Sequence, residues 1–350
     1  MKHDIFHLKP GTMAALALSA AVAAAIPAVI FGDDSLSFVA GSLAESDPAD
    51  YGPGTFKGDF GYNGFSEVVY YKADGPELEY GIDGTDKLEP QEIPDPGYRF
   101  IGCFDMDGDH RGDMVACRKF KVDNTEYIEV GYGKSGHLDE WQVLGVLGNP
   151  DNVKWEMYCG NFTGNKNRNS ILWYAPALGA MGYWADGKGV DSWVTIPGSY
   201  GQSNWKVLGI GNFTDAKNPR DSVLVRYNQF TIGYVSADGT FTVLGVLDDG
   251  KWIIVAVDDF THDGIDDVVL FHPGLRQLGL WDSGLSTKWR YLGTVEEGAV
   301  IEGSGEYDCD GNEDLLVRQA DGTMGYFQRG LPAKFKSFGY KKDSSWTVIP

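Results

Sequence analysis

Short runs in which apolar and polar residues alternate make up most of the chain after residue 32. A representative stretch contains WKVLGIGN at 205–212, VLVRY at 223–227, FTIGYV at 230–235 and FTVLG at 241–245. Alternation with period two and enrichment in β-branched and aromatic residues are typical of strands, whereas the period of an amphipathic helix is not evident after residue 32. The pattern therefore predicts an all-β chain of short strands.

A polar loop between the first and second of these strands returns six times along the sequence. Its first acidic or Asn residue is Asp59, Asp105, Asn161, Asn212, Asp259 and Glu306 in turn, at intervals of 46, 56, 51, 47 and 47 residues. A nearly constant period of this size indicates a repeat architecture.

Two further signatures follow each loop. The first is an apolar residue, a glycine and another apolar or aromatic residue, as in VGY at 130–132 and MGY at 324–326. The second begins with an aromatic residue, as in WRYLG at 289–293; we assign WTVIP at 346–350 to this place in the last repeat, and LEPQEIP at 88–94 in the first repeat matches it poorly.

Four strands in each repeat are typical of a β-propeller blade. Six repeats fill residues 55–350, which predicts a β-propeller of six four-stranded blades, with a seventh blade using SLSFVAG at 35–41 as the alternative. The chain begins and ends at predicted blade boundaries, so a strand shared between the two ends is not evident, and the sequence leaves open how the ring closes.

The N-terminal segment has a different character. Lys2 and Lys9 precede the uncharged segment 11–32, which predicts an export signal over residues 1–32, either cleaved or kept as a membrane anchor, and a linker over 33–54. We therefore expect a secreted, periplasmic or cell-surface protein that contacts membrane only through residues 1–32, if these are not cleaved.

The charge of the chain narrows its partners. It contains 50 acidic and 29 basic residues among 350, for a formal charge of −21. Binding to nucleic acid needs clustered positive charge, so we expect no nucleic-acid partner.

Four cysteines, Cys103, Cys117, Cys159 and Cys309, are too few for a disulfide framework. Cys103 and Cys117 can face each other across a hairpin, or all four can be buried as small apolar residues.

The acidic loops are the candidate chemistry. Carboxylates crowded at every second or fourth position repel one another, and a hard cation removes that repulsion. Counted from the first residue of each loop, offsets 0, 2, 4 and 8 carry oxygen ligands, and offset 6 adds a backbone carbonyl. The predicted metal ligands are Asp105, Asp107, Asp109, Arg111 and Asp113; Asp259, Thr261, Asp263, Ile265 and Asp267; and Glu306, Asp308, Asp310, Asn312 and Asp314.

All of these ligands are hard oxygens, so calcium is favoured over zinc or copper, and magnesium is the weaker candidate. The first loop is a weaker site with Asp59, Asn63 and Glu67, which gives two to four calcium ions in total. The third and fourth loops, with Asn169 and Asp221 at the last ligand position, are expected to hold their turns without metal. At offset 5 we expect a positive φ, which suits Gly264 and Gly311 and places His110 in an unusual conformation.

The loop DMDGDHRGD, its GDF and GNF leads and its VV or LL tails resemble the FG-GAP or VCBS repeat family, to which the integrin α-subunit propeller belongs. The resemblance covers residues 55–350. It implies an exported calcium-binding propeller used in adhesion or carbohydrate recognition, with the carboxylates of loops two, five and six as calcium ligands. Thr261 and His110 depart from the family pattern. The departures bear on how tightly loops five and two bind calcium more than on whether they bind it.

Two classes of function remain from the sequence. The first is a non-enzymatic recognition module for a glycan or an extracellular protein, with Trp173, Tyr174, Tyr183 and Trp184 as candidate ligand contacts. Core packing is the alternative explanation for the same four residues. The second class is a polysaccharide-active enzyme, a lyase or glycosidase, which needs a pair of carboxylates that the metal does not use. A purely structural surface component is a third alternative.

Overall fold

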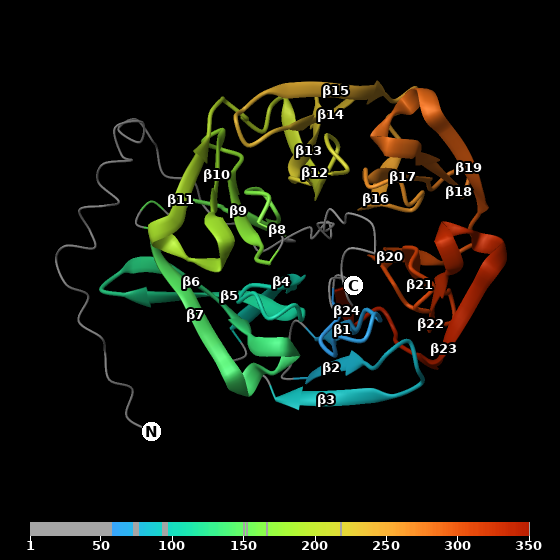
Figure 1. Cartoon of the computed structure of the whole chain (residues 1–350), viewed down its shortest axis with the longest axis horizontal. Helices are drawn as coiled ribbons and strands as arrows, with labels where there is room; N and C mark the ends of the chain where they lie inside the picture. The colour runs from blue at the N-terminus through green and yellow to red at the C-terminus, as the bar shows by residue number, and fades with distance from the viewer. Residues whose placement is uncertain are drawn as a thin grey trace.

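The chain folds into six separate four-stranded sheets arranged as blades around a central axis (Figure 1). The computed structural model describes residues 58–72, 77–92, 97–149, 151, 153–165, 167–217 and 219–349. Neighbouring strands within each blade are antiparallel. The prediction of an all-β, six-bladed propeller is confirmed, while segments 1–32 and 33–54, and with them the alternative seventh blade, lie outside the described residues.

Blades 2 to 6 each use four strands that follow one another in the chain, from the innermost to the outermost. Blade 2 contains β4 (Tyr98–Phe104), β5 (Asp113–Val122), β6 (Thr125–Gly133) and β7 (Trp141–Asn149). Blade 3 contains β8 (Glu156–Gly160), β9 (Ser170–Ala175), β10 (Ala180–Trp184) and β11 (Trp193–Ile196). Blade 4 contains β12 (Trp205–Gly211), β13 (Ser222–Tyr227), β14 (Thr231–Val235) and β15 (Phe241–Val246). Blade 5 contains β16 (Ile253–Asp258), β17 (Asp267–His272), β18 (Gln277–Trp281) and β19 (Trp289–Thr294). Blade 6 contains β20 (Val300–Gly305), β21 (Asp314–Arg318), β22 (Thr323–Phe327) and β23 (Phe335–Lys341).

Blade 1 joins the two ends of the described chain. Its inner strand is β24 (Thr347–Ile349), which pairs with β1 (Val68–Tyr71); β2 (Glu77–Gly81) and β3 (Leu88–Glu92) complete the sheet. Val69 lies opposite Ile349, and Figure 1 shows β24 beside β1 near the axis. A strand shared between the two ends therefore closes the ring, a pairing that was not evident from the sequence.

The same finding corrects the assignment of the last repeat. WTVIP at 346–350 is not the outer strand of blade 6, because Thr347–Ile349 are the inner strand of blade 1. The outer strand of blade 6 is β23, which starts with FKSFG at 335–339. The first five residues of LEPQEIP, a poor match in sequence, form the outer strand β3 (Leu88–Glu92).

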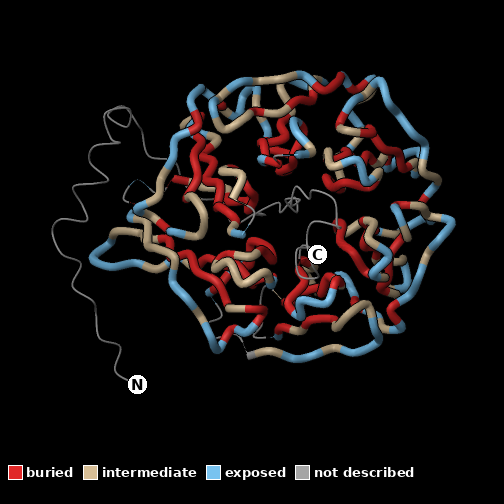
Figure 2. The backbone as a smooth tube through the Cα atoms, in the orientation of Figure 1, coloured by how far each residue is buried: buried red, intermediate tan, exposed pale blue. Residues whose placement is uncertain are grey.

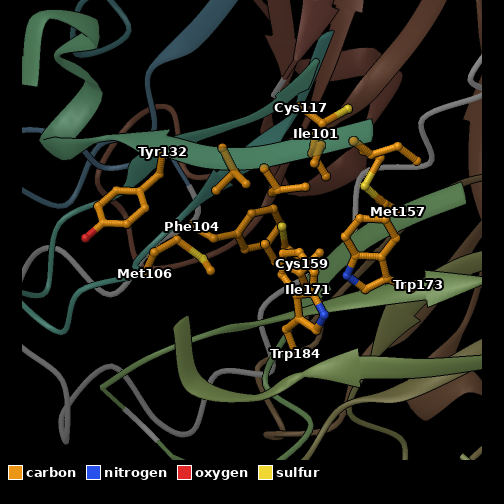
Figure 3. Packing of buried hydrophobic residues seen from close by; sticks show 13 residues of the cluster. Ile101, Phe104, Met106, Cys117, Tyr132, Met157, Cys159, Ile171, Trp173 and Trp184 are labelled. Carbon is orange, nitrogen blue, oxygen red and sulfur yellow. The ribbon is translucent and has the colours of Figure 1, made fainter. Parts of the chain in front are cut away.

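The core lies between blades. The inner strands of consecutive blades contact one another all the way round the ring, and Figure 2 shows burial concentrated inside the blades while the outer strands are largely exposed. Blades 2 and 3 illustrate the packing: Phe104, Cys159, Trp173 and Trp184 belong to one buried cluster (Figure 3). Burying large aromatic side chains in this way removes a large apolar area from water.

The recurring glycine in the third strand of a blade has a steric reason. An aromatic side chain at the start of the outer strand lies against this glycine in five blades. A Cβ built on the glycine would be 1.9–2.8 Å from the ring in the pairs Gly131 with Trp141, Gly182 with Trp193, Gly233 with Phe241, Gly279 with Trp289, and Gly325 with Phe335. The glycine and aromatic signatures are thus two halves of one contact.

Among the described residues, the four cysteines do not form disulfide bonds with one another. Cys103, Cys117 and Cys159 are buried and Cys309 is exposed. In the β4–β5 pair, Cys103 lies opposite Met114 and Cys117 lies opposite Arg99, so Cys103 and Cys117 are not cross-strand partners. In the described part of the chain, no helix has the length and apolar character needed to cross a membrane.

Candidate metal centres

The six polar loops precede the second strand of each blade, and we number them by blade. Loop 1 is 59–67, loop 2 is 105–113, loop 3 is 161–170, loop 4 is 212–222, loop 5 is 259–267 and loop 6 is 306–314. Backbone hydrogen bonds join neighbouring loops, as from Asn169 N to Asp105 O at 2.8 Å. The loops therefore gather around the axis at one end of the propeller.

The first carboxylate of each acidic loop accepts hydrogen bonds from its own loop. Gly108 N and His110 N donate to the two oxygens of Asp105 at 2.7 and 2.9 Å. Asp263 N and Gly264 N donate to Asp259 at 3.0 and 2.8 Å. Such local bonds curl the chain around the carboxylate.

This curl requires left-handed backbone at two positions. At offset 5 the φ angles are 67° for His110, 81° for Gly264 and 76° for Gly311, which confirms the expected conformation. Offset 3 is left-handed too, with φ of 60° for His262 and 56° for Cys309. Gly108 in loop 2 and Gly164 in loop 3 hold the same offset with φ of 86° and 77°, and these glycines are the sequence signal for the second position.

The last carboxylate of the loop is held from two sides. Asp113 accepts from Met106 N and Ser135 N, both at 2.8 Å. Asp314 accepts from Tyr307 N at 3.2 Å and Arg329 N at 2.7 Å. The second donor belongs to the turn after the third strand, so this carboxylate connects its loop to that turn.

Two groups of predicted ligands come together among the described residues. Asp105, Asp107 and Asp113 offer oxygens within 4.8 Å of one another, and so do Glu306, Asp308 and Asp314. Oxygens at this spacing can coordinate one cation.

Loop 6 contains oxygens without a protein partner. Glu306 is 0% exposed, and its Oε2 atom accepts no hydrogen bond. Asp308 Oδ1 is also buried without a partner. A buried carboxylate oxygen without a partner is energetically unfavourable, and a bound cation would supply the missing interaction. The donor set of loop 6 therefore fits a hard divalent ion.

Burial raises the pKa values of these loop carboxyls. It raises the pKa of Glu306 to about 7 and that of Asp314 to about 8, against backbone hydrogen bonds that oppose the rise. In loop 2 burial raises the pKa of Asp105 to about 6 and that of Asp113 to about 7. Hydrogen bonds from the protein offset only part of the effect of burial on these carboxyls.

The carboxylate at offset 4 faces the turn after the third strand. Asp109 Oδ2 lies 3.2 Å from Lys134 Nζ, and Asp310 Oδ2 lies 3.0 Å from Arg329 Nη2. In loop 5, Ser283 Oγ donates to Asp263 Oδ2 at 2.9 Å.

At offset 6 the N–H groups of Arg111, Ile265 and Asn312 donate to the offset 4 carboxylate of their own loop, at 2.9–3.0 Å. These bonds form a tight local turn in each acidic loop.

Loop 5 resembles the other acidic loops in its backbone but is neutral at offset 2. Thr261 N and Ser283 N donate to the two oxygens of Asp267 at 2.8 and 2.6 Å. Burial raises the pKa of Asp267 to about 8. Thr261 Oγ1 lies 3.4 Å from Asp267 Oδ1.

Loop 1 also has backbone hydrogen bonds to its first and last carboxylates, but at offset 4 it carries Asn63 in place of an aspartate. Asp59 accepts from Asn63 N and Gly64 N, and Glu67 Oε2 accepts from Phe60 N at 2.7 Å. The Asn63 side chain donates to Asp83 Oδ1 at 2.7 Å.

Loops 3 and 4 shift the predicted last ligand by one residue. Strand register places Ser170 opposite Gly160 and Ser222 opposite Gly211, where Asp267 lies opposite Asp258 in loop 5. Serines therefore occupy the last ligand position, and the assignment of Asn169 and Asp221 to it is wrong.

Asp221 instead connects two blades. Asp221 N donates to Asn161 O at 2.8 Å, and Asn161 N donates to Asp221 Oδ2 at 2.6 Å. Asn212 and Asp266 make the same reciprocal pair. The sequence signal for this junction is an acidic residue directly before the second strand of a blade.

The four aromatic residues predicted as ligand contacts are core residues. Trp173, Tyr174, Tyr183 and Trp184 are 0%, 1%, 6% and 2% exposed. Trp173 and Trp184 pack against each other with ring centroids 4.6 Å apart, and Tyr183 stacks on Phe162. Packing between blades accounts for their positions, and they present no open surface to a sugar or a protein.

Comparison with known proteins does not identify a family for the chain. No family model and no curated protein match the chain. The chain is similar to the solved structure of oligopeptidase B from Trypanosoma brucei with covalently bound antipain, in its closed form, at 12% identity and a TM-score of 0.39. The match covers 78% of this chain and 48% of that chain, so this chain spans about half the length of the oligopeptidase.

Proposed function

We propose that the chain is an exported calcium-binding β-propeller that serves as a non-enzymatic recognition or adhesion module for a glycan or an extracellular protein. The calcium is structural and lies in loop 6. The observation that carries this proposal is the buried Oε2 atom of Glu306, which has no partner and lies in a group with Asp308 and Asp314.

The choice of ion follows from the donor atoms. Glu306, Asp308 and Asp314 offer carboxylate oxygens without a nitrogen or sulfur ligand in the group. Calcium accepts six to eight oxygens in flexible geometry, whereas magnesium demands a near-ideal octahedron. The resemblance of the loops to FG-GAP repeats supports the same ion.

An ion in loop 6 would act on the closing junction of the ring. Ser66 N of blade 1 donates to Glu306 O at 2.7 Å, and Glu306 N donates to Ser66 Oγ at 3.1 Å. Fixing the Glu306 side chain therefore also fixes the backbone that holds blade 6 to blade 1. Because the ion binds the folded state, it stabilises that state by mass action.

The recognition role rests on the scaffold and on the sequence. Loops carried by a rigid framework are common sites of recognition, and the ring presents six such loops at one end. The export signal predicted for residues 1–32 supports a secreted, periplasmic or cell-surface location, where calcium is abundant and glycans are accessible.

Thermal melting of the full-length chain tests the metal part of the proposal. We expect calcium added after EDTA to raise the melting temperature, and magnesium to raise it less. Equal melting curves in EDTA and calcium would contradict the calcium site. The recognition part is tested with arrays of glycans and of extracellular proteins probed in calcium, where shortening of a polysaccharide by the chain would favour the enzyme instead.

A further inference from the structure

Loops 2 and 6 have carboxylates at the same four offsets but differ in what faces them. In loop 2, Lys134 Nζ lies 2.7 Å from Asp107 Oδ2 and 3.2 Å from Asp109 Oδ2. The ammonium group therefore bridges two carboxylates that were predicted as metal ligands.

Lys134 occupies a position that the blades use differently. It is the first residue of the turn after the third strand, directly before Ser135, whose φ is 47°. The same position holds Ala185 in blade 3, Asp282 in blade 5 and Gln328 in blade 6. In blade 6 a neutral amide thus replaces the ammonium, and Gln328 Nε2 donates to Asp308 Oδ2 at 2.6 Å.

The oxygens of the two loops are satisfied to different degrees. All eight carboxylate oxygens of loop 2 accept a hydrogen bond, from backbone N–H groups, from Lys134 or from Ser135 Oγ. In loop 6, Glu306 Oε2 and Asp308 Oδ1 are buried and accept none. Every carboxylate oxygen of loop 2 therefore has a hydrogen-bond donor in the protein, whereas two carboxylate oxygens of loop 6 have none and are available to an ion.

The surroundings of loop 2 add a second positive charge. A Cβ built on Gly108 would lie 3.1 Å from Nε of Arg168, so the guanidinium of blade 3 lies against the tip of loop 2. Near loop 6 the cation is Arg329, which lies at the turn position of Ser135 and bonds Asp310, outside the group formed by Glu306, Asp308 and Asp314.

We propose that the ammonium of Lys134 holds in loop 2 the place that a divalent cation holds in loop 6, so that Lys134 closes loop 2 to metal. The inference rests on the proposed calcium site. Among the described residues, three carboxylate ligands come together only in loops 2 and 6. The inference therefore replaces the expectation of two to four ions with one ion at loop 6, and it makes Lys134 the residue that decides which acidic loop takes metal.

The test counts bound calcium on the full-length chain by equilibrium dialysis with radioactive calcium. We expect one ion for the wild type and two for K134M, because removing the ammonium frees Asp107 and Asp109. K134R keeps the charge and should bind one ion. K188M is the matched control: Lys188 pairs with Asp186 at the equivalent turn of blade 3, beside a loop that has no carboxylate in its sequence, and its loss should leave the count at one.

The variant K134M/D113N shows where the second ion lies, since losing a loop 2 ligand should return the count to one. K134Q, which keeps a hydrogen-bond donor, replaces K134M if that variant does not fold.

One ion in both the wild type and K134M overturns the role of Lys134 and leaves the proposed calcium site standing. Two ions in the wild type also overturn it, since loop 2 then binds metal beside Lys134. If the wild type binds no calcium, the proposed function is wrong. A gain of one ion in K134M would then still support Lys134 as the cation that closes loop 2 to metal. No gain in K134M would overturn the role of Lys134 as well.

Discussion

The indole ring of Trp289 occupies the space beside Gly279 where any larger residue would place its side chain. A Cβ built on Gly279 would lie 1.9 Å from Cη2 of Trp289. We expect G279A to lower the free energy of unfolding by about 1–3 kcal/mol, the usual penalty for overpacking. Urea unfolding measures the change.

Gly201 provides the matched control for this substitution. Its Cβ would meet no atom within 4 Å, so G201A should change stability by less than about 0.5 kcal/mol. In the double variant G279A/W289A the clash is absent, and the two losses should therefore sum to more than the loss measured in the double variant. Strict additivity would show that the ring and the glycine act independently.

Ile349 anchors the strand that closes the ring. Its side chain is 6% exposed, and it lies opposite Val69 in blade 1. Truncation to alanine leaves a cavity, so I349A should lower the free energy of unfolding by about 2–5 kcal/mol. Urea midpoints compare it with V246A, whose side chain is 62% exposed and should tolerate the change. Equal urea midpoints for I349A and V246A would contradict the packing of β24 against β1.

Substitution of Glu306 tests the proposed calcium site, because it should change the melting temperature in opposite directions with and without calcium. In EDTA, E306Q should melt at a higher temperature than the wild type, because the substitution replaces a buried, uncompensated carboxylate with a neutral amide. In calcium the order should reverse, since at one hundred times its dissociation constant an ion adds about 2.7 kcal/mol to the wild type alone.

Calorimetry in the two buffers provides this comparison. E296Q changes an exposed carboxylate in the strand connection after β19 and should follow the wild type in both buffers. A variant E306Q that responds to calcium as strongly as the wild type would place the ion elsewhere.

Asp221 should matter for stability and not for metal. D221A removes the acceptor of the buried Asn161 N–H group, which costs about 1–3 kcal/mol when a buried donor loses its partner. The calcium-dependent rise in melting temperature should be unchanged. D191A, at an exposed position on blade 3, serves as the control, and a loss of calcium response in D221A would show that loop 4 contributes to a metal site.

Sequence periodicity was sufficient to predict the blades but not the pairing of β24 with β1 that closes the ring. The loop and glycine signatures fix six repeats because each reports a local contact within one blade. WTVI at 346–349 has the alternation of any strand, and its pairing with Val68–Tyr71 depends on contacts between residues almost a whole chain apart. The spacing held a clue: it begins 22 residues after MGY at 324–326, whereas WRYLG follows LGL at 278–280 by 11.

The grouping of the candidate ligands was predictable from the sequence, whereas the difference between loops 2 and 6 was not. The offsets located Glu306, Asp308 and Asp314, which the fold brings together. They gave loops 2 and 6 equal standing, because the bridging Lys134 lies 27 residues from Asp107 and reaches it only through the hairpin of β5 and β6. The aromatic residues failed for a related reason: composition does not distinguish Trp173 in a wedge between blades from a tryptophan on a surface.

The pairing of β24 with β1 also sets the order in which the protein can be completed. Strands of blades 2 to 6 lie next to each other in sequence, so each blade can form as its last strand emerges during synthesis. Blade 1 waits with three strands until Thr347–Ile349 have emerged. A chain interrupted before these residues is left with an open edge at β1, exposed to pairing with other chains. The final strand thus acts as a check that the whole ring has been made.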